Sequence, residues 1–297
     1  MSQPNYLLYM AHGDHTFKNE VLGSVLSYLL RKQSQPAEQR ATVLIYTDQS
    51  IYFQRVLGEA PGVIYEEIRA AEWRAWRGDI DFVHRVKIEL LQHALTNYGG
   101  NVLYLDSDTY FLRDEAPLFA ALARGQSVMH VREGVLSQSR VPLHQAVYAY
   151  LMAHPAPEWA AVSPATAMYN AGAIGLSAGH AALLTQVLHL TDTLYRVNPS
   201  HVVEQFAFSY CLAGAGPVLE VAPYVLHYWH MKDIRPVLAA FFTRVAGQPL
   251  GQVLTEFAAL PVVAASQQKD RWEARPRWQR GVLRALGRGW HWPAATR

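Results

Sequence analysis

Cysteine is nearly absent from this 297-residue sequence, which contains a single one, Cys211. One thiol cannot form a disulfide within the chain or a cysteine metal cluster, so packing must hold the fold together. Charged residues make up 17% of the chain and hydrophobic residues 51%, which is typical of a folded protein and excludes a disordered one. The length is sufficient for one large α/β domain or two smaller ones.

Long apolar runs are also missing. No stretch of about 18 uninterrupted apolar residues occurs, so the sequence predicts no membrane-spanning helix. The beginning, MSQPNYLLYMAHGD, lacks the basic start and apolar centre of a signal peptide, and we therefore expect a cytoplasmic protein. The segment AHGD (11–14) contains one glycine and is not a phosphate-binding loop, which argues against a kinase or a Rossmann dehydrogenase.

Positive charge is scarce in most of the chain and concentrated near its end. Eight Lys or Arg and two acidic residues follow residue 268, which leaves 18 basic and 22 acidic residues on the rest. A nucleic-acid-binding protein normally carries positive charge on its folded body, so we expect no nucleic-acid partner. The composition changes near residue 266, and we expect a main domain over 1–265 and a basic, tryptophan-rich tail over 266–297.

The apolar pattern predicts strands that alternate with helices. Strands are expected at 6–10, 42–48, 62–68 and 101–106, and helices near 21–29 and 82–95. These strands are continuously apolar, which is typical of a mostly parallel sheet covered by helices on both faces. Ligands collect beyond the carboxyl ends of such strands, and four aspartates follow them there: Asp14, Asp48, Asp106 and Asp108.

The segment YGGNVLYLDSDTYF (98–111) ends an apolar strand with two aspartates. Side chains two residues apart on an extended segment point the same way, so Asp106 and Asp108 project together while Ser107 faces the opposite side. Two carboxylates on one face can bind a hard divalent cation such as Mn²⁺ or Mg²⁺. Phosphatases of the haloacid-dehalogenase type have a similar aspartate pair, but the second acidic cluster that they need is missing after Asp114.

This aspartate segment resembles the metal-binding segment of GT-A glycosyltransferases, and three later segments follow in that family's order: MYNAGAIGL (168–176), VVEQFAFSY (202–210) and VLHYWHMKDIRP (225–236). The resemblance covers roughly residues 6–236 and is nearest to the glycogenin-like and lipopolysaccharide galactosyltransferase-like retaining families. It implies an α/β GT-A fold with a mostly parallel sheet flanked by helices. It also implies divalent-metal-dependent transfer of a sugar from a nucleotide-diphosphate donor, most often UDP-linked, to a hydroxyl acceptor.

The resemblance further implies a metal and nucleotide site. Asp106 and Asp108 would bind the cation together with His227 or His230, and His227 is favoured because an aromatic residue follows it. Cationic side chains would neutralise the donor diphosphate: Lys232, with Arg235 in reserve, and Arg85 or Lys87 on the outer side of the helix over 82–95. The remaining nucleotide contacts would come from Ala11, Asp14, Asp48 and Ser107.

The sugar would lie near Asn170, Glu204 and Gln205. In a retaining enzyme the polar side chains there support an oxocarbenium-like state, whereas in an inverting enzyme Glu204 would be the general base. Two other functions remain open. One is a sugar nucleotidyltransferase of the same fold, although its glycine-rich basic beginning is missing, and the other is a non-catalytic binding module.

The tail segment RWEARPRWQRGVLRALGRGWHWP (271–293) contains four of the eight tryptophans. On a helix, one row would be apolar (Trp278, Val282, Leu286 and Trp290) and another basic (Arg280, Arg284 and Arg288). A helix of this kind favours peripheral contact with the inner face of an anionic membrane, where a lipid-linked glycan could be the acceptor. The alternative is a helix that packs on the main domain.

Overall fold

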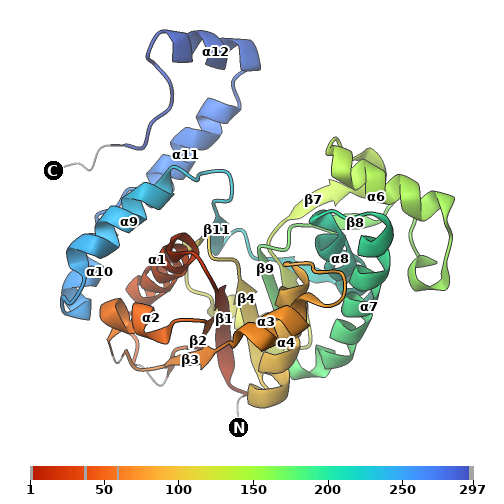
Figure 1. The fold of residues 1–297 in the computed structure, drawn as a ribbon, viewed down its shortest axis with the longest axis horizontal. Coiled ribbons are helices and arrows are strands. Elements are labelled where there is room, and N and C mark those ends of the chain that lie inside the picture. Colours follow the sequence, from red (N-terminus) through yellow and green to blue (C-terminus); the bar gives the residue numbers. More distant parts are fainter. Residues whose placement is uncertain (1–2, 37–38, 59, 294–297) are drawn as a thin grey trace.

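A seven-stranded sheet forms the centre of the computed structural model, which describes residues 3–36, 39–58 and 60–293 (Figure 1). Its strand order is β10 (Val218–Glu220), β6 (Ser127–Met129), β9 (Ala173–Ser177), β4 (Asn101–Leu105), β1 (Asn5–Ala11), β2 (Thr42–Thr47) and β3 (Val63–Glu67). Neighbouring strands are parallel except for β9, which runs antiparallel to both β4 and β6. The mostly parallel sheet expected from the sequence is confirmed.

Helices cover both faces of this sheet (Figure 1). One face is covered by α1 (His15–Arg31), α2 (Ser50–Leu57), α5 (Ala116–Ala123), α9 (Ile234–Val245) and α10 (Leu250–Ala258). The other is covered by α3 (Ala70–Arg77), α4 (Arg85–Tyr98), α6 (Pro142–Ala153), α7 (Ala181–Val197) and α8 (Val202–Ala215). In β4, Leu103 and Leu105 enter the first core while Val102 and Tyr104 enter the second. A strand buried on both faces has no polar positions, which explains the continuous apolar runs.

Two short sheets complete the edge at which β1, β2, β4 and β6 end. One pairs β5 (Thr109–Phe111) with β11 (Val225–His227), and the other pairs β7 (Arg132–Val135) with β8 (Ala167–Tyr169). His227 lies opposite Thr109 in the first of them. The antiparallel strand β9 begins at this edge, since Ala173 pairs with Leu105. Segments from distant parts of the chain therefore meet there.

Two segments near this edge differ from simple readings of the sequence. The motif segment 168–176 is not one element: it divides into β8 and β9, and residues 170–172 form the connection between them. The helix expected over 82–95 begins at Arg85, so Val83 is exposed while Arg85 and Lys87 are buried. The expectation that these two cations lie on the outer side of the helix is thus overturned.

The tail begins with α11 (Val262–Glu273) and α12 (Arg277–Ala285), and α12 lies at the far end of α11, away from the sheet (Figure 1). The expected boundary at residue 266 falls inside α11, where Ala265 and Ser266 are buried. Because α12 ends at Ala285, the apolar row predicted for this helix does not include Trp290. No helix among the described residues combines the length and hydrophobicity needed to cross a bilayer.

Candidate active site

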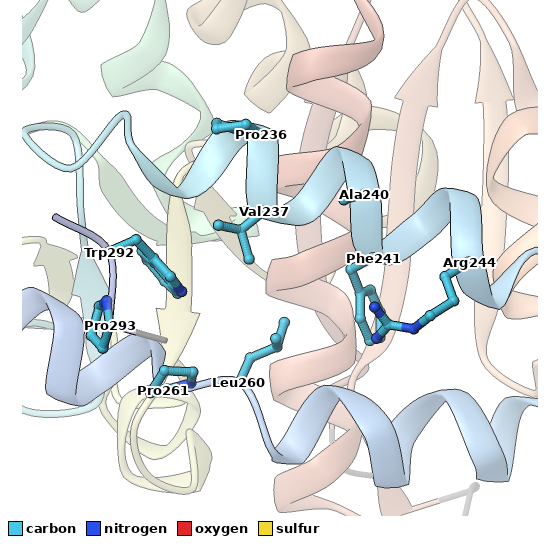
Figure 2. Close-up of a pocket in the computed structure, with 9 residues that line it drawn as sticks. All are labelled: Pro236, Val237, Ala240, Phe241, Arg244, Leu260, Pro261, Trp292 and Pro293. Atoms are coloured by element: carbon cyan, nitrogen blue, oxygen red, sulfur yellow. The ribbon is translucent and has the colours of Figure 1, made fainter. Parts of the chain in front are cut away.

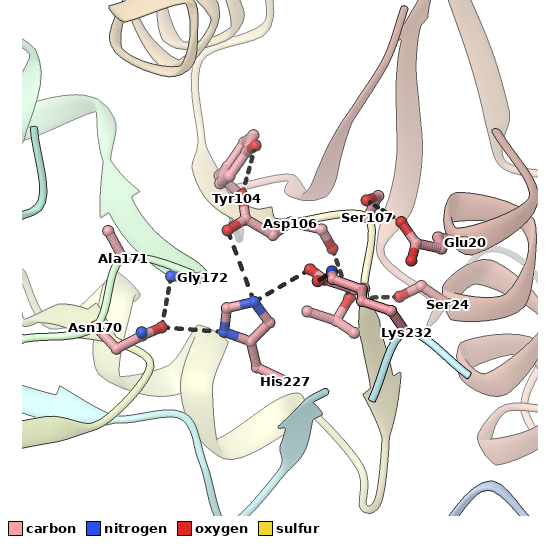
Figure 3. Close-up of polar contacts among 12 residues, drawn as sticks. Glu20, Ser24, Tyr104, Asp106, Ser107, Asn170, Ala171, Gly172, His227 and Lys232 are labelled. Atoms are coloured by element: carbon pink, nitrogen blue, oxygen red, sulfur yellow. Dashed lines mark hydrogen bonds and ion pairs between the residues drawn. The ribbon is translucent and has the colours of Figure 1, made fainter. Parts of the chain in front are cut away.

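Two aspartates and one histidine come together at the edge where the sheet strands end (Figure 3). Within the described residues, Asp106, Asp108 and His227 form the one group of three potential metal ligands whose donor atoms all lie within 4.8 Å of each other. Nε2 of His227 lies 3.1 Å from Oδ1 of Asp108 and 3.8 Å from Oδ2 of Asp106. The two carboxylates face the same side, as the spacing of the residues predicts.

The opposite side of the aspartate segment is anchored on α1. Three buried polar residues of this helix, Glu20, Ser24 and Ser27, recur at helical spacing within its apolar face. They bond alternate residues of the segment: Ser107 Oγ donates to Glu20 (3.0 Å), Ser24 Oγ lies 2.8 Å from Thr109 Oγ1, and the Phe111 amide donates to Ser27 (2.8 Å). Sequence reasoning missed this set, although its spacing was visible. Ser107 therefore has a structural partner on the side away from the carboxylates.

Asn170 fixes the orientation of the His227 ring (Figure 3). Its Oδ1 accepts a hydrogen bond from the Gly172 amide (2.9 Å), so this oxygen is an acceptor for Nδ1–H of His227 at 3.0 Å. With the proton on Nδ1, the lone pair of Nε2 is directed at the two aspartates, which is the tautomer that a metal ion requires.

The donor set fits a divalent cation of the Mn²⁺ or Mg²⁺ type. Two carboxylates and one imidazole would supply oxygen and nitrogen ligands from one side of the cation. Its remaining coordination positions would be left to water or to oxygen atoms of a bound molecule. A Cβ added at Gly172 would overlap Nδ1 of His227, so only glycine allows the chain to pass behind the ring. The metal expectation for Asp106, Asp108 and His227 is therefore compatible with the geometry.

Cationic side chains of the protein neutralise both aspartates. Nζ of Lys232 lies 2.5 Å from Oδ2 of Asp108. Burial alone would raise the pKa of Asp108, but His227 and Lys232 outweigh it and hold this pKa far below its usual range. Lys87, buried in α4, lies 3.3 Å from Oδ1 of Asp106 and donates to the carbonyl of Ala171. Of the two cations expected from α4, Lys87 is thus the one that reaches the metal group.

Glu204 lies behind the site and is sealed from solvent. Its carboxylate is 3.4 Å from Nζ of Lys87, and burial raises the pKa of Glu204 to about 7 although the lysine opposes this shift. Desolvation would lower the pKa of Lys87, but Asp106 and Glu204 raise it more strongly, so the ammonium remains charged. A carboxylate in this position can balance the charge of Lys87, but it has no open path to an acceptor hydroxyl.

The open side of the site holds a carboxylate that sequence reasoning missed, Glu133 on β7. It accepts from Nδ2 of Asn170 at 3.1 Å and from Nε2 of Gln205 at 2.9 Å. His144 of α6 lies 3.6 Å from the same carboxylate. Asn170 and Gln205, both expected at the sugar, are therefore brought together by Glu133, which no local motif identified.

Other expected residues have different surroundings. Nε2 of His230 lies 3.0 Å from Asp270 of α11, outside the metal group, so the alternative of His230 as third ligand is overturned. Arg85 pairs with Glu89 and Asp192 and joins α4 to α7 instead of facing the aspartates.

The expected nucleotide contacts lie on the loops after β1 and β2. Ala11 is the buried last residue of β1. Asp14 caps α1 by accepting from the Thr16 amide at 2.6 Å. Asp48 accepts from the Gly13 amide at 3.1 Å and pairs with the buried Lys18 at 3.0 Å, which ties the two loops together. These residues lie at the same edge of the sheet as the metal group, at the part of the edge where β1 and β2 end.

Known glycosyltransferase structures share this fold. The apo form of mouse xyloside xylosyltransferase 1 aligns with 73% of this chain and 86% of its own, with a TM-score of 0.51 and 12% identity. The glycosyltransferase GlyE of Streptococcus pneumoniae TIGR4 aligns with 86% of this chain and 63% of its own, with a TM-score of 0.51 and 13% identity. The bifunctional glycosyltransferase WbbM aligns with 74% of this chain and 39% of its own, with a TM-score of 0.51 and 10% identity.

These similarities establish that the chain has the GT-A glycosyltransferase fold, as the order of its motifs predicts. The sequence itself matches no known family profile and no curated protein. At such low identities the likeness concerns the fold alone, so the chemistry must be argued from the side chains at the sheet edge.

Proposed function

We propose that this protein transfers a sugar from a nucleotide-diphosphate donor, with UDP as the nucleotide, to a hydroxyl group of a glycan acceptor. The observation that carries the proposal is the group of Asp106, Asp108 and His227 at the carboxyl edge of a GT-A sheet. A Mn²⁺ or Mg²⁺ ion held there would supply Lewis-acid stabilisation of the diphosphate as the bond to the sugar breaks. A binding module has no need of such a group.

Lys232 is suited to bind the diphosphate. Its side chain is 45% exposed although its ammonium contacts the buried Asp108, so it can turn outward without unfolding its surroundings. With a cation on Asp108, Lys232 would lose this partner and would be free to bond a phosphate oxygen. Lys87 has a different role, because it is buried and contacts Asp106 from behind the site.

We further propose that the reaction retains the configuration at the anomeric carbon. An inverting enzyme needs a carboxylate that is free to reach the acceptor. Glu204 is sealed behind Lys87, and the carboxylate of Glu133 on the open side is engaged by the amides of Asn170 and Gln205. The amides of Asn170 and Gln205, joined by Glu133, lie on the open side, where they can bond sugar hydroxyls. NMR spectroscopy of the first product formed from an α-linked donor tests this: an α-linkage supports retention, and a β-linkage contradicts it.

Calorimetry of UDP binding with and without Mn²⁺ tests the activity class. We expect binding that depends on Mn²⁺ and that weakens at least about 100-fold in Asp108→Asn, since the metal loses a ligand. Asp79→Asn is the control, because Asp79 is exposed and remote in sequence from the metal group. UDP binding that is indifferent to Mn²⁺ would favour a binding module. Formation of a nucleotide sugar from UTP and a sugar phosphate would favour a nucleotidyltransferase.

We also propose that α12 contacts an anionic membrane surface and that the acceptor is a lipid-linked glycan. Trp278 and Leu286, on one side of this region, are 72% and 64% exposed, and arginines flank them. Apolar groups exposed beside cations suit the interface of an anionic bilayer.

Co-sedimentation with vesicles tests the membrane contact in the full chain. We expect binding to phosphatidylglycerol vesicles, little binding to phosphatidylcholine vesicles, and loss of binding in Trp278→Ser/Leu286→Ser. Met152→Ser is the matched control, because Met152 is an exposed apolar residue on α6, far from the tail in the sequence. Equal sedimentation of wild type and the double variant would exclude this role for α12.

A further inference from the structure

The loop from β11 to α9, residues 228–233, has an inner and an outer side. On the inner side, His227 before the loop and Lys232 within it contact Asp108. On the outer side, His230 and Asp233 contact α11 of the tail. One short loop therefore connects the metal group to a helix that is distant in the sequence.

The outer contacts consist of two charged pairs on consecutive residues of α11. Nζ of Lys269 donates a hydrogen bond to Oδ2 of Asp233 at 3.0 Å. Oδ1 of Asp270 lies 3.0 Å from Nε2 of His230, although this pair lacks the alignment of a hydrogen bond. The Lys269–Asp233 pair is thus the better-formed link, and the second pair adds an electrostatic contact beside it.

The end of the tail holds Lys269 in this position. The chain folds back after α12, and the ring of Trp290 covers Nζ of Lys269 with the ring centroid 4.4 Å away. Trp292 then lies beside α9 at a cavity of about 480 Å³ that is also lined by Val237 and Pro261 (Figure 2). The segment after α12 is therefore folded back onto α9 and α11, whereas α12 itself projects.

The position of Asp233 affects Lys232, which is the lysine that contacts Asp108. Lys232 directly precedes Asp233, and Asp233 is the residue from which α9 starts. Tyr228 and Met231 anchor the inner side of the loop in the core, whereas Lys232 and Asp233 are exposed. A contact that fixes Asp233 therefore restricts where the Lys232 ammonium can reach, between Asp108 and a diphosphate outside it.

We propose that Lys269 and Asp270 are positioning residues for the donor diphosphate: they hold the loop from outside so that Lys232 is presented to the site. This inference rests on the proposed function, since it assigns the diphosphate as the group that Lys232 meets. It gives α11 a part in donor binding, in addition to any contact that α12 makes with a surface.

A double-mutant cycle on the full-length protein tests this role. The affinity for UDP in the presence of Mn²⁺ is measured by calorimetry for wild type, Lys269→Met, Asp233→Asn and the double variant. We expect each single variant to bind UDP roughly threefold to fivefold more weakly, as for an ion pair near the surface. The double variant should be no weaker than either single one, because both remove the same contact. Lys269→Arg should restore most of the affinity.

Two further measurements separate positioning from general stabilisation. Uridine lacks the diphosphate, so its affinity should be unchanged in Lys269→Met if the effect is exerted through Lys232. Arg271→Ala removes an exposed positive charge from the same helix and should leave UDP binding unchanged. Equal weakening of UDP and uridine, or wild-type UDP affinity in both single variants, would overturn the inference. Absence of Mn²⁺-dependent UDP binding by wild type would instead refute the proposed function.

Discussion

The carboxyl edge of the sheet and the C-terminal tail both concentrate charge, but they treat it in opposite ways. At the edge, charged groups are paired and most of them are buried or partly buried: Asp108 contacts His227 and the more exposed Lys232, and Lys87 contacts Asp106 and Glu204. On α12 the arginines are mostly solvated, and the apolar residues beside them are exposed. A charged group that has been removed from water needs partners in a defined geometry, whereas a solvated charged group is available to contact another surface.

The difference shows which parts of the molecule tolerate change. The edge is fixed by contacts on all sides, from α1, α4, β8 and the loop after β11, so a small displacement there affects every partner. The tail contacts the main domain mainly through α11 and the segment after α12. The same substitution should therefore have unlike consequences in the two regions.

Gly172→Ala should give the largest effect. The new Cβ would overlap the His227 ring, which must move away from the metal group, and a displacement of about 1 Å can reduce activity roughly 100-fold. Gly281→Ala in α12 meets no atom within 4 Å and should instead stabilise the helix by up to about 1 kcal/mol. Sugar-transfer rates and thermal unfolding of both variants check the comparison. Similar activities would show that the edge is not as rigid as its contacts indicate.

Glu204→Gln should change the pH dependence of stability. Burial raises the pKa of Glu204 to about 7, so the folded protein holds this proton up to about pH 7, whereas the unfolded chain loses it near pH 4.5. Wild type should therefore lose stability relative to Glu204→Gln as pH rises from 4.5 to 7, by at most about 3 kcal/mol, and the difference should then level off.

Urea unfolding across this pH range, with EDTA present to remove metal ions, measures the difference for Glu204. A constant difference at all pH values would mean that Glu204 is ionised throughout. Glu256→Gln is the control for a glutamate outside the site, because Glu256 lies on α10 and contacts Arg244 and Gln252 near the surface.

Ser24→Ala should cost a smaller amount of stability, about 1–3 kcal/mol, since it leaves the buried hydroxyl of Tyr9 without a partner and leaves the Thr109 hydroxyl only its bond to the Asp106 carbonyl. Trp278→Ser in the tail should change the unfolding free energy by less than about 0.5 kcal/mol, because that side chain is exposed. Urea unfolding at neutral pH gives both values. A larger loss for Trp278→Ser would show that α12 is held against the main domain.

The sequence alone was sufficient for the four parallel strands β1 to β4 of the sheet, the order of the motifs and the shared direction of Asp106 and Asp108. These features depend on apolar periodicity and on the alternation of an extended chain, which act over a few residues. The helical spacing of the polar residues Glu20, Ser24 and Ser27 is an equally local pattern. It could have predicted that this helix forms hydrogen bonds with a neighbouring strand.

Tertiary structure decided which distant residues meet. Asp108 and His227 are 119 residues apart in the sequence, and the aromatic residue after His227 favoured it over His230 by resemblance alone. Strand register then brings His227 opposite Thr109, beside the aspartates, while His230 turns outward to α11. Glu133 and the burial of Lys87 were hidden for the same reason: contacts across strands and helices depend on how the elements pack, and residue types alone do not specify them.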